Sequence, residues 1–351
     1  NTLTTPRFKD KEQLRTYDYV VANPPFSDKE WSTGLHLGDS GATDPYQRFT
    51  WGVPPPKQGD YAYLLHIIRS MNRPGKAACI LPHGVLFRGN AEAVIREKLV
   101  TSGILKGIIG LPANLFYGTG IPACVLVLDR QNASARKGVM MVDASKGFIK
   151  DGNKNRLRER DIHKIVDAFA RLEDMAGYAR MVPLDEIASD KNAYNLNLPR
   201  YIDSTQAEDI QDLAAHLQGG IPQRDLDALA DYWKVMPGLR KLLFRPLRPG
   251  YAQLQLPLAE VKTAVLNHPE FAAFNTQACN SFAAWRGRQL PALQGIQPGN
   301  KPKALVEQLA EDLLSTFQPI PLLDAYAVYQ HLMDYWAAVM QDDVYLLVQD
   351  G

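Results

Sequence analysis

The stretch Tyr19-Val20-Val21-Ala22-Asn23-Pro24-Pro25-Phe26 decides how the rest of the sequence is interpreted. Its first half is a short and continuously apolar run, which is typical of a β-strand that is buried on both faces. Its second half ends the strand, because two consecutive prolines cannot donate the hydrogen bonds that continue a β-ladder. We therefore expect a buried strand that stops abruptly at a rigid Asn-Pro-Pro-Phe turn.

Apolar runs and helical patterns alternate downstream of this turn. Short apolar runs predict further strands at residues 77–81, 104–111, 124–128 and 139–142. Apolar residues at helical spacing predict helices over residues 60–73, 90–101 and 161–172. This alternation is typical of a doubly wound α/β sheet, in which ligands bind beyond the carboxyl ends of the strands. Both the Asn-Pro-Pro-Phe turn and the loop that begins at Leu111-Pro112 follow such an end.

The overall composition is that of an ordinary globular protein with room for two domains, since 46% of the 351 residues are hydrophobic and 22% are charged. The formal charge is only +1, so any surface for nucleic acid must be local. No apolar run approaches the ~20 residues that span a bilayer, and we expect no membrane-spanning segment. Cys79, Cys124 and Cys279 lack ligand-like spacing, which predicts buried free thiols, no metal site and a cytoplasmic location.

The Asn-Pro-Pro-Phe turn suits one kind of chemistry. An arylamine nitrogen is a weak nucleophile because its lone pair is delocalised into the ring, and two acceptors for its N–H bonds localise that pair. The side-chain oxygen of Asn23 and the carbonyl of Pro24 can be those acceptors, and Pro25 stiffens the backbone between them and the ring. Phe26 offers a flat face to a base flipped out of a duplex. The alternative is a proline-terminated strand without chemistry, but the pattern arises by chance in about one such chain in a few hundred.

Four segments make this sequence resemble the modification subunits of type I restriction enzymes, which are adenine-specific DNA methyltransferases. They are residues 18–26, 75–87, 111–122 and 195–201. The resemblance spans about residues 1–203, and beyond residue 204 only the helical tail of longer family members is similar. It implies methyl transfer from S-adenosylmethionine to the adenine 6-amino group, with Asn23 and Pro24 as acceptors and Phe26 stacked on the base.

The same resemblance implies partners and a donor contact. It implies that the protein acts on DNA and binds a specificity subunit, which selects the target sequence. A restriction (nuclease) subunit is a further candidate partner. The opening Asn1-Thr2-Leu3 is similar to the end of a segment that touches the adenine of the methyl donor, which makes Asn1 a candidate cofactor-binding residue. The family's glycine-rich donor-binding turn does not occur in this sequence.

The predicted organisation has three parts. Residues 1–182 form part of a doubly wound, Rossmann-like methyltransferase sheet, and residues 204–351 form a mainly helical domain. Residues 183–203 are the segment that connects the two. The chain starts without methionine close to a strand and stops directly after an apolar run. We therefore expect both ends to be cut from a longer protein, with an exposed sheet edge and uncovered apolar surface as a consequence.

Several further residues are candidates for a functional role, and each also has a purely structural interpretation. Phe116 lies in the second loop, where it either closes over the flipped base or plugs the packing. The region 130–164 contains ten lysines and arginines, which either contact DNA phosphates or form a solvated face. The candidates for DNA binding are Lys150, Lys154, Arg156 and Arg158. Asp60 and His66 on the first helix are interpreted as a helix cap and a satisfied surface group.

Two rival functions remain open at this point. One is a different amino methyltransferase with the same Asn-Pro-Pro-aromatic signature, acting on ribosomal RNA guanine or on a protein glutamine amide. The other is a non-catalytic assembly module, for which the acidic helical stripe of residues 301–350 would be a docking surface rather than core. Methylation of a cytosine ring carbon is excluded, because that chemistry needs a Pro-Cys nucleophile and the sequence has no such dipeptide.

Overall fold

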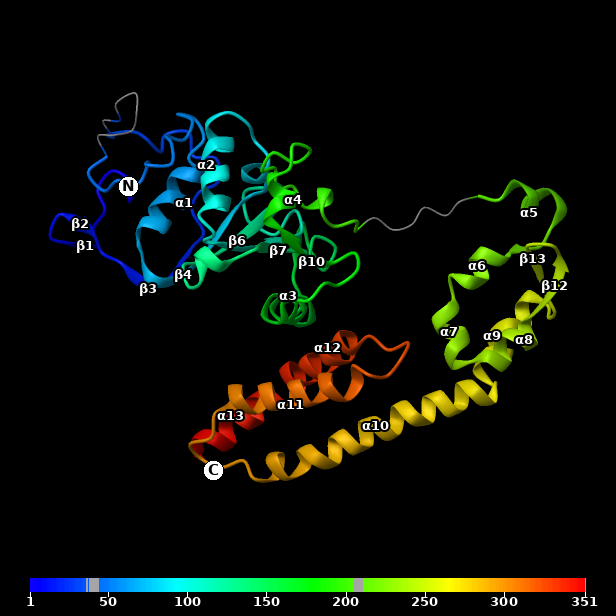
Figure 1. The fold of residues 1–351 in the computed structure, drawn as a ribbon. Helices are drawn as coiled ribbons and strands as arrows, with labels where there is room; N and C mark the ends of the chain where they lie inside the picture. The colour runs from blue at the N-terminus through cyan, green and yellow to red at the C-terminus, as the bar shows by residue number, and fades with distance from the viewer. Residues whose placement is uncertain (36, 38–43, 205–210, 351) are drawn as a thin grey trace. The chain divides into compact units, whose positions relative to one another are not determined.

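The computed structural model describes residues 1–35, 37, 44–204 and 211–350. The chain folds as two compact units, Asn1–Gln206 and Ala207–Gly351 (Figure 1). The first unit is a mixed α/β structure and the second is mainly helical, which confirms the predicted fold class. The two units meet in sequence a few residues beyond the predicted start of the helical part at residue 204.

A six-stranded mixed sheet lies at the centre of the first unit, with the strand order β10-β7-β5-β6-β4-β3. Its strands are β3 (Tyr17–Ala22), β4 (Met71–Pro82), β5 (Leu105–Gly110), β6 (Ala123–Asp129), β7 (Gly138–Asp143) and β10 (Ala179–Pro183). β3 pairs in parallel with β4, and β5 pairs in parallel with β7. β6 runs antiparallel to both β4 and β5. The carboxyl ends of β3, β4, β5 and β7 therefore meet at one edge of the sheet.

Helices cover both faces of this sheet (Figure 1). α1 (Asp60–Arg69) and α2 (Ala91–Thr101) pack on one face, and α3 (Glu159–Arg171) packs on the other. Successive residues of β5 show the alternation, because Ile108 joins the first core and Ile109 joins the second. β7 is buried along its whole length because both faces of the sheet are covered there, as its continuous apolar run predicts.

Strand β3 departs from the prediction of burial on both faces. Val20 and Ala22 pack against the core beneath α1, but Tyr19 and Val21 on the other face are 75% and 81% exposed. β3 is the last strand of the sheet as described, and the core under α3 is built from the opposite half of the sheet. The structure thus has the exposed edge and the uncovered apolar surface that the sequence predicts.

Two other boundaries differ from the sequence prediction. α1 ends at Arg69, and residues 71–82 form one long strand rather than a helical turn followed by a short strand. The strand begins early because Met71 pairs with Tyr17 of β3. Residues 183–203 are not a mere connection, since α4 (Leu184–Ala188) follows β10 and the side chains of Leu196 and Leu198 are buried in the main core.

Two short hairpins complete the first unit. β1 (Lys9–Asp10) pairs with β2 (Gln13–Leu14) ahead of the sheet, and β8 (Ile149–Asp151) pairs with β9 (Lys154–Arg156) before α3. No helix within the described ranges has both the length and the apolarity needed to cross a membrane. Likewise, no cluster of three or more His, Cys, Asp and Glu side chains suited to a metal ion occurs among those residues.

The second unit contains a small sheet that the helical patterns do not predict, with the order β11-β13-β12. Its strands are β11 (Ile221–Pro222), β12 (Phe244–Arg248) and β13 (Tyr251–Leu254). Its helices are α5 (Leu213–Gln218), α6 (Gln223–Asp227), α7 (Ala230–Val235), α8 (Pro237–Leu243), α9 (Leu258–Leu266), α10 (Pro269–Gln294), α11 (Pro302–Phe317), α12 (Ala325–Tyr335) and α13 (Gln341–Asp350). A one-turn π-helix, Trp336–Met340, lies between the last two.

The apolar stripe near the end of the chain is core, because Tyr329, Leu332 and Trp336 are buried in a cluster with residues of α11. Tyr335, by contrast, is 56% exposed. The prediction of buried thiols holds for Cys79 and Cys124 and is wrong for Cys279, which is exposed on α10. Its polar neighbours on the helix, Thr276 and Asn280, are exposed as well.

Gly103 sets a steric constraint between α2 and β5. Its φ is +68°, and a Cβ at this position would lie 2.0 Å from the carbonyl oxygen of Ala133. We predict that Gly103→Ala lowers the free energy of unfolding of the first unit by more than about 2 kcal/mol, because backbone strain and a displaced main chain add. Urea denaturation followed by circular dichroism measures the loss.

The matched control is Gly152→Ala in the β8–β9 turn. Gly152 has a φ of +57°, and no atom lies within 4 Å of the added Cβ. The free energy of unfolding of this variant should therefore fall by only roughly 1 kcal/mol, which is the cost of a left-handed conformation for alanine. Equal losses for the two variants would show that the Ala133 carbonyl does not constrain the turn.

Candidate active site

The Asn-Pro-Pro-Phe turn leaves the sheet at the carboxyl end of β3, where the sequence places it. Asn23 is exposed, and none of the described residues hydrogen-bonds to its side-chain amide. Pro24 and Phe26 are half-buried, and Pro25 is exposed. The oxygen of Asn23 is therefore available to accept a hydrogen bond from a bound group.

The ring of Phe26 contacts the ring of Phe116 in the second loop. Their centroids are 5.7 Å apart and the ring planes meet at 71°, which is an edge-to-face arrangement. The contact joins the loop after β3 to the loop between β5 and β6. Phe116 is thus a packing partner of Phe26, and its contact with a target base stays a prediction. Tyr117, next to it, is 94% exposed.

The β8–β9 hairpin holds this second loop in place. The Nζ of Lys154 donates hydrogen bonds to the carbonyl oxygens of Phe116 and Thr119, at 2.6 and 3.1 Å. The side-chain amide of Asn155 donates to the carbonyl of Ala113 at 2.7 Å. Lys154 is half-buried and bonded within the chain, which the prediction of a DNA-facing lysine did not anticipate.

The other three candidates for DNA binding differ in their surroundings. Arg158 donates two hydrogen bonds to Asp161, at 2.8 and 3.0 Å, at the start of α3. Arg156 is exposed and forms an ion pair of 3.1 Å with Asp151. Lys150 is exposed, with its ammonium 5.7 Å from the centroid of the Phe148 ring. Lys150 and Arg156 are therefore the two candidates that present their charge to solvent.

Asp60 supports the first loop, in a role that the interpretation as a helix cap missed. The cap of α1 is Gly59, and Asp60 is its first residue, with a side chain that is fully buried. Its Oδ1 accepts a hydrogen bond of 2.7 Å from the backbone N–H of Ser27, the residue after Phe26. Ser27 has a φ of +51°, so this bond fixes a left-handed conformation at the residue that follows Phe26.

Arg88 completes the support of Asp60. Its guanidinium lies 2.5 Å from Asp60 and 2.5 Å from Glu92, and both carboxylates are buried. Burial alone would lower the pKa of Arg88, but hydrogen bonds and charge from Glu92 and Asp60 raise it above its ordinary value. A Cβ on Gly84 would lie 2.2 Å from Arg88 Nη1, so a larger residue in the turn after β4 would displace this guanidinium.

Arg96 extends the network to the end of the α/β unit. Its guanidinium donates to the carbonyl oxygens of Arg88, at 2.8 Å, and of Tyr194, at 2.7 Å. The backbone N–H of Leu196 in turn donates to the carbonyl of Leu86. Three of the segments that carry the sequence resemblance, residues 18–26, 75–87 and 195–201, are thereby connected, partly through the side chains of Asp60, Arg88 and Arg96 bonded to residues in or next to these segments, and partly through the Leu196–Leu86 backbone bond.

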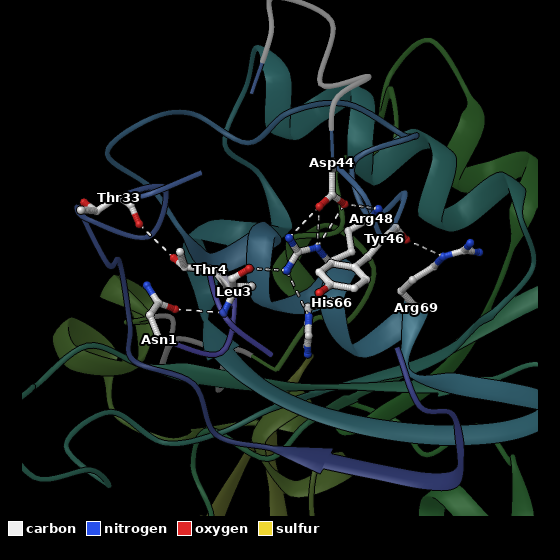
Figure 2. A network of polar contacts seen from close by, with 9 residues as sticks. All are labelled: Asn1, Leu3, Thr4, Thr33, Asp44, Tyr46, Arg48, His66 and Arg69. Carbon is white, nitrogen blue, oxygen red and sulfur yellow. Dashed lines mark hydrogen bonds and ion pairs between the residues drawn. The ribbon is translucent and has the colours of Figure 1, made fainter. Parts of the chain in front are cut away.

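The beginning of the chain is anchored by a second network (Figure 2). The guanidinium of Arg48 is buried, pairs with Asp44 at 2.7 Å and donates to the carbonyl of Leu3, also at 2.7 Å. The Oδ1 of Asn1 accepts a hydrogen bond of 3.0 Å from Leu3, while the residue itself is exposed. The network fixes where Asn1 lies, and donor binding by Asn1 stays a prediction.

His66 belongs to this network rather than to the surface. Its ring is half-buried, with Nδ1 3.4 Å from Arg48. Burial, together with the charge of Arg48, lowers the pKa of His66 to about 4. The imidazole is therefore neutral at pH 7, which removes a second positive charge from the neighbourhood of the buried guanidinium.

The first unit combines a mixed α/β sheet with an available asparagine oxygen and a supported aromatic ring at one strand end. These are the features that the chemistry of the turn predicts for an amino methyltransferase. The profile of the N-6 DNA Methylase family matches residues 1–210, and the chain belongs to that family.

Relatives that are named as methylase subunits of type I restriction enzymes confirm the resemblance to type I modification subunits. The type I restriction enzyme MjaVII methylase subunit of Methanocaldococcus jannaschii is 34% identical over 206 residues, which cover 57% of this chain and 35% of that protein. The HindI methylase subunit of Haemophilus influenzae is 33% identical over 218 residues, 60% of this chain and 46% of that protein. The chain therefore spans less than half the length of these relatives.

A solved structure supports the fold of the first unit. The crystal structure of the type I restriction-modification system methyltransferase subunit from Streptococcus thermophilus is 36% identical in sequence, with a TM-score of 0.51. The similarity covers 58% of this chain and 41% of that one. The sheet and its helices are thus similar to those of a known methyltransferase subunit.

The support of the first loop can be tested through Asp60. We predict that Asp60→Ala lowers the free energy of unfolding by about 3–5 kcal/mol, because it leaves the Arg88 charge and the Ser27 N–H without this buried partner. Asp151→Ala breaks an ion pair whose side chains are 59% and 63% exposed, and should cost less than about 1 kcal/mol. Comparable costs in urea denaturation would show that the Asp60 network does not stabilise the unit.

Proposed function

We propose that this chain is part of the site-specific DNA adenine methyltransferase subunit of a type I restriction–modification system. The observation that carries the proposal is the available Asn23 oxygen beside Phe26, at a strand end of a chain in the N-6 DNA Methylase family. The relatives named as type I methylase subunits support it. Family membership also favours DNA over ribosomal RNA or a protein glutamine as the substrate.

The residues of the turn have distinct tasks in this proposal. The Oδ1 of Asn23 and the carbonyl of Pro24 accept the two N–H bonds of the adenine 6-amino group, which draws the lone pair of that nitrogen out of the ring. Pro24 and Pro25 hold the acceptors in position before the base arrives. Phe26, kept in place by Phe116 and by the Ser27–Asp60 bond, supports the flipped base by stacking. S-adenosylmethionine, when bound, supplies the methyl group on a sulfonium.

The residues of this chain can hold only part of the S-adenosylmethionine donor. Asn1 is exposed and uses its Oδ1 on Leu3, which leaves its amide N–H groups for the adenine of the donor. A strand, glycine turn and helix of the kind that cradles the methionine end of the donor does not occur in the 351 residues. We therefore assign to this chain the base-holding side of the site.

Partners follow from the same proposal. A specificity subunit would select the DNA sequence and a restriction (nuclease) subunit would complete the system, in the cytoplasm. The mainly helical second unit is the candidate docking region for these subunits. A purely structural assembly module is the remaining alternative, and an assay of methyl transfer to DNA distinguishes it from an enzyme.

Asn23 gives the direct test of the chemistry. In an active assembly that contains this chain, Asn23→Ala should reduce methyl transfer to duplex DNA at least about a hundredfold, because it removes a preorganised acceptor. Asn23→Asp keeps an acceptor oxygen at the same reach and should retain more activity than the alanine variant. DNA affinity should change little in both. Near-normal methylation by Asn23→Ala, followed with a radiolabelled donor, contradicts the catalytic assignment.

The DNA-binding prediction now focuses on Lys150 and Arg156. Replacing both with alanine should flatten the slope of log affinity against log salt by up to about 2, since each phosphate contact contributes about 0.9. Lys98→Ala, an exposed lysine on α2, serves as the control and should leave the slope unchanged. Fluorescence anisotropy with a labelled duplex measures both. An unchanged slope in the double variant means that these residues are merely solvated.

A further inference from the structure

A polar cavity lies at the edge of the sheet opposite the Asn-Pro-Pro-Phe turn. Its volume is about 330 Å³, at the lower end of small-ligand sites. Three arginines line it: Arg69 from the end of α1, Arg73 from the start of β4 and Arg130 from the residue after β6. β3 runs from Thr16 at this cavity to Asn23 in the turn, so the two sites are roughly 20–25 Å apart.

The positive charge of this cavity is not balanced by its own lining. Among the described lining residues none is an aspartate or a glutamate. A nearby carboxylate, Asp18, is hydrogen-bonded by the side chain of Asn72. Three guanidinium groups therefore face a common space without a carboxylate among them.

Arg130 has unmet hydrogen-bonding capacity. Its Nη2 donates to the carbonyl of Ile68 at 2.7 Å, but its Nε is buried and has no partner within the described chain. Burial, with the added charges of Arg69 and Arg73, lowers the pKa of Arg130. Buried donors are nearly always hydrogen-bonded in folded proteins, so a donor left over beside a cavity points to a ligand.

The other two arginines differ in their hydrogen-bond partners. Arg69 is fixed by a hydrogen bond from its Nε to the carbonyl of Tyr46, at 2.9 Å (Figure 2). Its Nη2 donates a second bond to Gln47, at 3.2 Å. Arg73 is exposed, and among the described residues it has no hydrogen-bond or ion-pair partner. The cavity thus has a fixed cationic wall and one arginine that is free to close on a ligand.

We propose that this cavity binds a phosphate group, held by Arg69, Arg73 and Arg130. Guanidinium forks match the oxygen pairs of phosphate, and three of them compensate its charge. Gln13, Thr16 and Tyr46 also line the cavity and can bind the hydroxyl groups of an attached sugar. The phosphate belongs either to a DNA backbone or to a free nucleotide, and the two sources share this chemistry.

The test is calorimetric titration of the full 351-residue chain with pyrophosphate, at ionic strength matched with chloride. We expect saturable binding that Arg73→Gln weakens roughly tenfold or more, as loss of a charge-assisted hydrogen bond typically does. Arg73→Lys, which keeps the charge, should weaken it less. Lys98→Gln should bind like the unchanged chain. Without ligand, Arg73→Gln should raise the thermal midpoint by about 1 °C, because repulsion among the arginines is relieved.

Two results would overturn the proposal. One is pyrophosphate binding no stronger than that of chloride, and the other is an equal loss of affinity in Lys98→Gln and Arg73→Gln. Competition by a short duplex identifies the source of the phosphate. Displacement of pyrophosphate assigns the cavity to the DNA backbone, and binding that persists in saturating duplex assigns it to a free phosphate compound.

Discussion

The structure of the sheet edge that carries the candidate site depends on one buried carboxylate, that of Asp60. It accepts the backbone N–H of Ser27, the residue that follows Phe26, and pairs with Arg88 from the turn after β4. Burying a carboxylate is costly unless hydrogen bonds and an opposite charge compensate it, and here both do. Because these partners come from three separate parts of the chain, the loop after β3, the start of α1 and the turn after β4 hold one another in place.

The second loop has its own support, and an aromatic contact joins it to the loop after β3. Lys154 and Asn155 bond the carbonyls of residues 113–119, whereas the Asp60 network fixes the loop after β3. The edge-to-face contact of Phe26 and Phe116 then joins two independently fixed loops. Such an arrangement holds the ring behind the turn while Asn23 remains exposed, which is what a preorganised acceptor site requires.

The sequence predicts the elements of this site better than their connections. The apolar run before Asn23 and the two prolines locate the turn, since both signals are local. Asp60 was mistaken for a cap, and the bonds of Lys154 to the second loop were not foreseen, because the partners of each lie 28 or more residues away in the chain. Apolar side chains likewise say that a strand can be buried, not that a neighbour covers it, and Val21 is therefore exposed. An acidic first residue of a buried helix, after a long loop, is the signal that could have identified Asp60.

The distribution of charge over the sheet suits the two edges to different chemistry. Arg88 and Arg96 are balanced by Asp60 and Glu92, so this network carries no net charge when all four groups are ionised. The opposite edge presents three arginines without a carboxylate among its described lining residues. An adenine amino group needs acceptors rather than cations, and a sulfonium donor is repelled by unbalanced positive charge. A separation of roughly 20–25 Å along β3 exceeds the screening length of about 8 Å in physiological salt, so the two edges act independently.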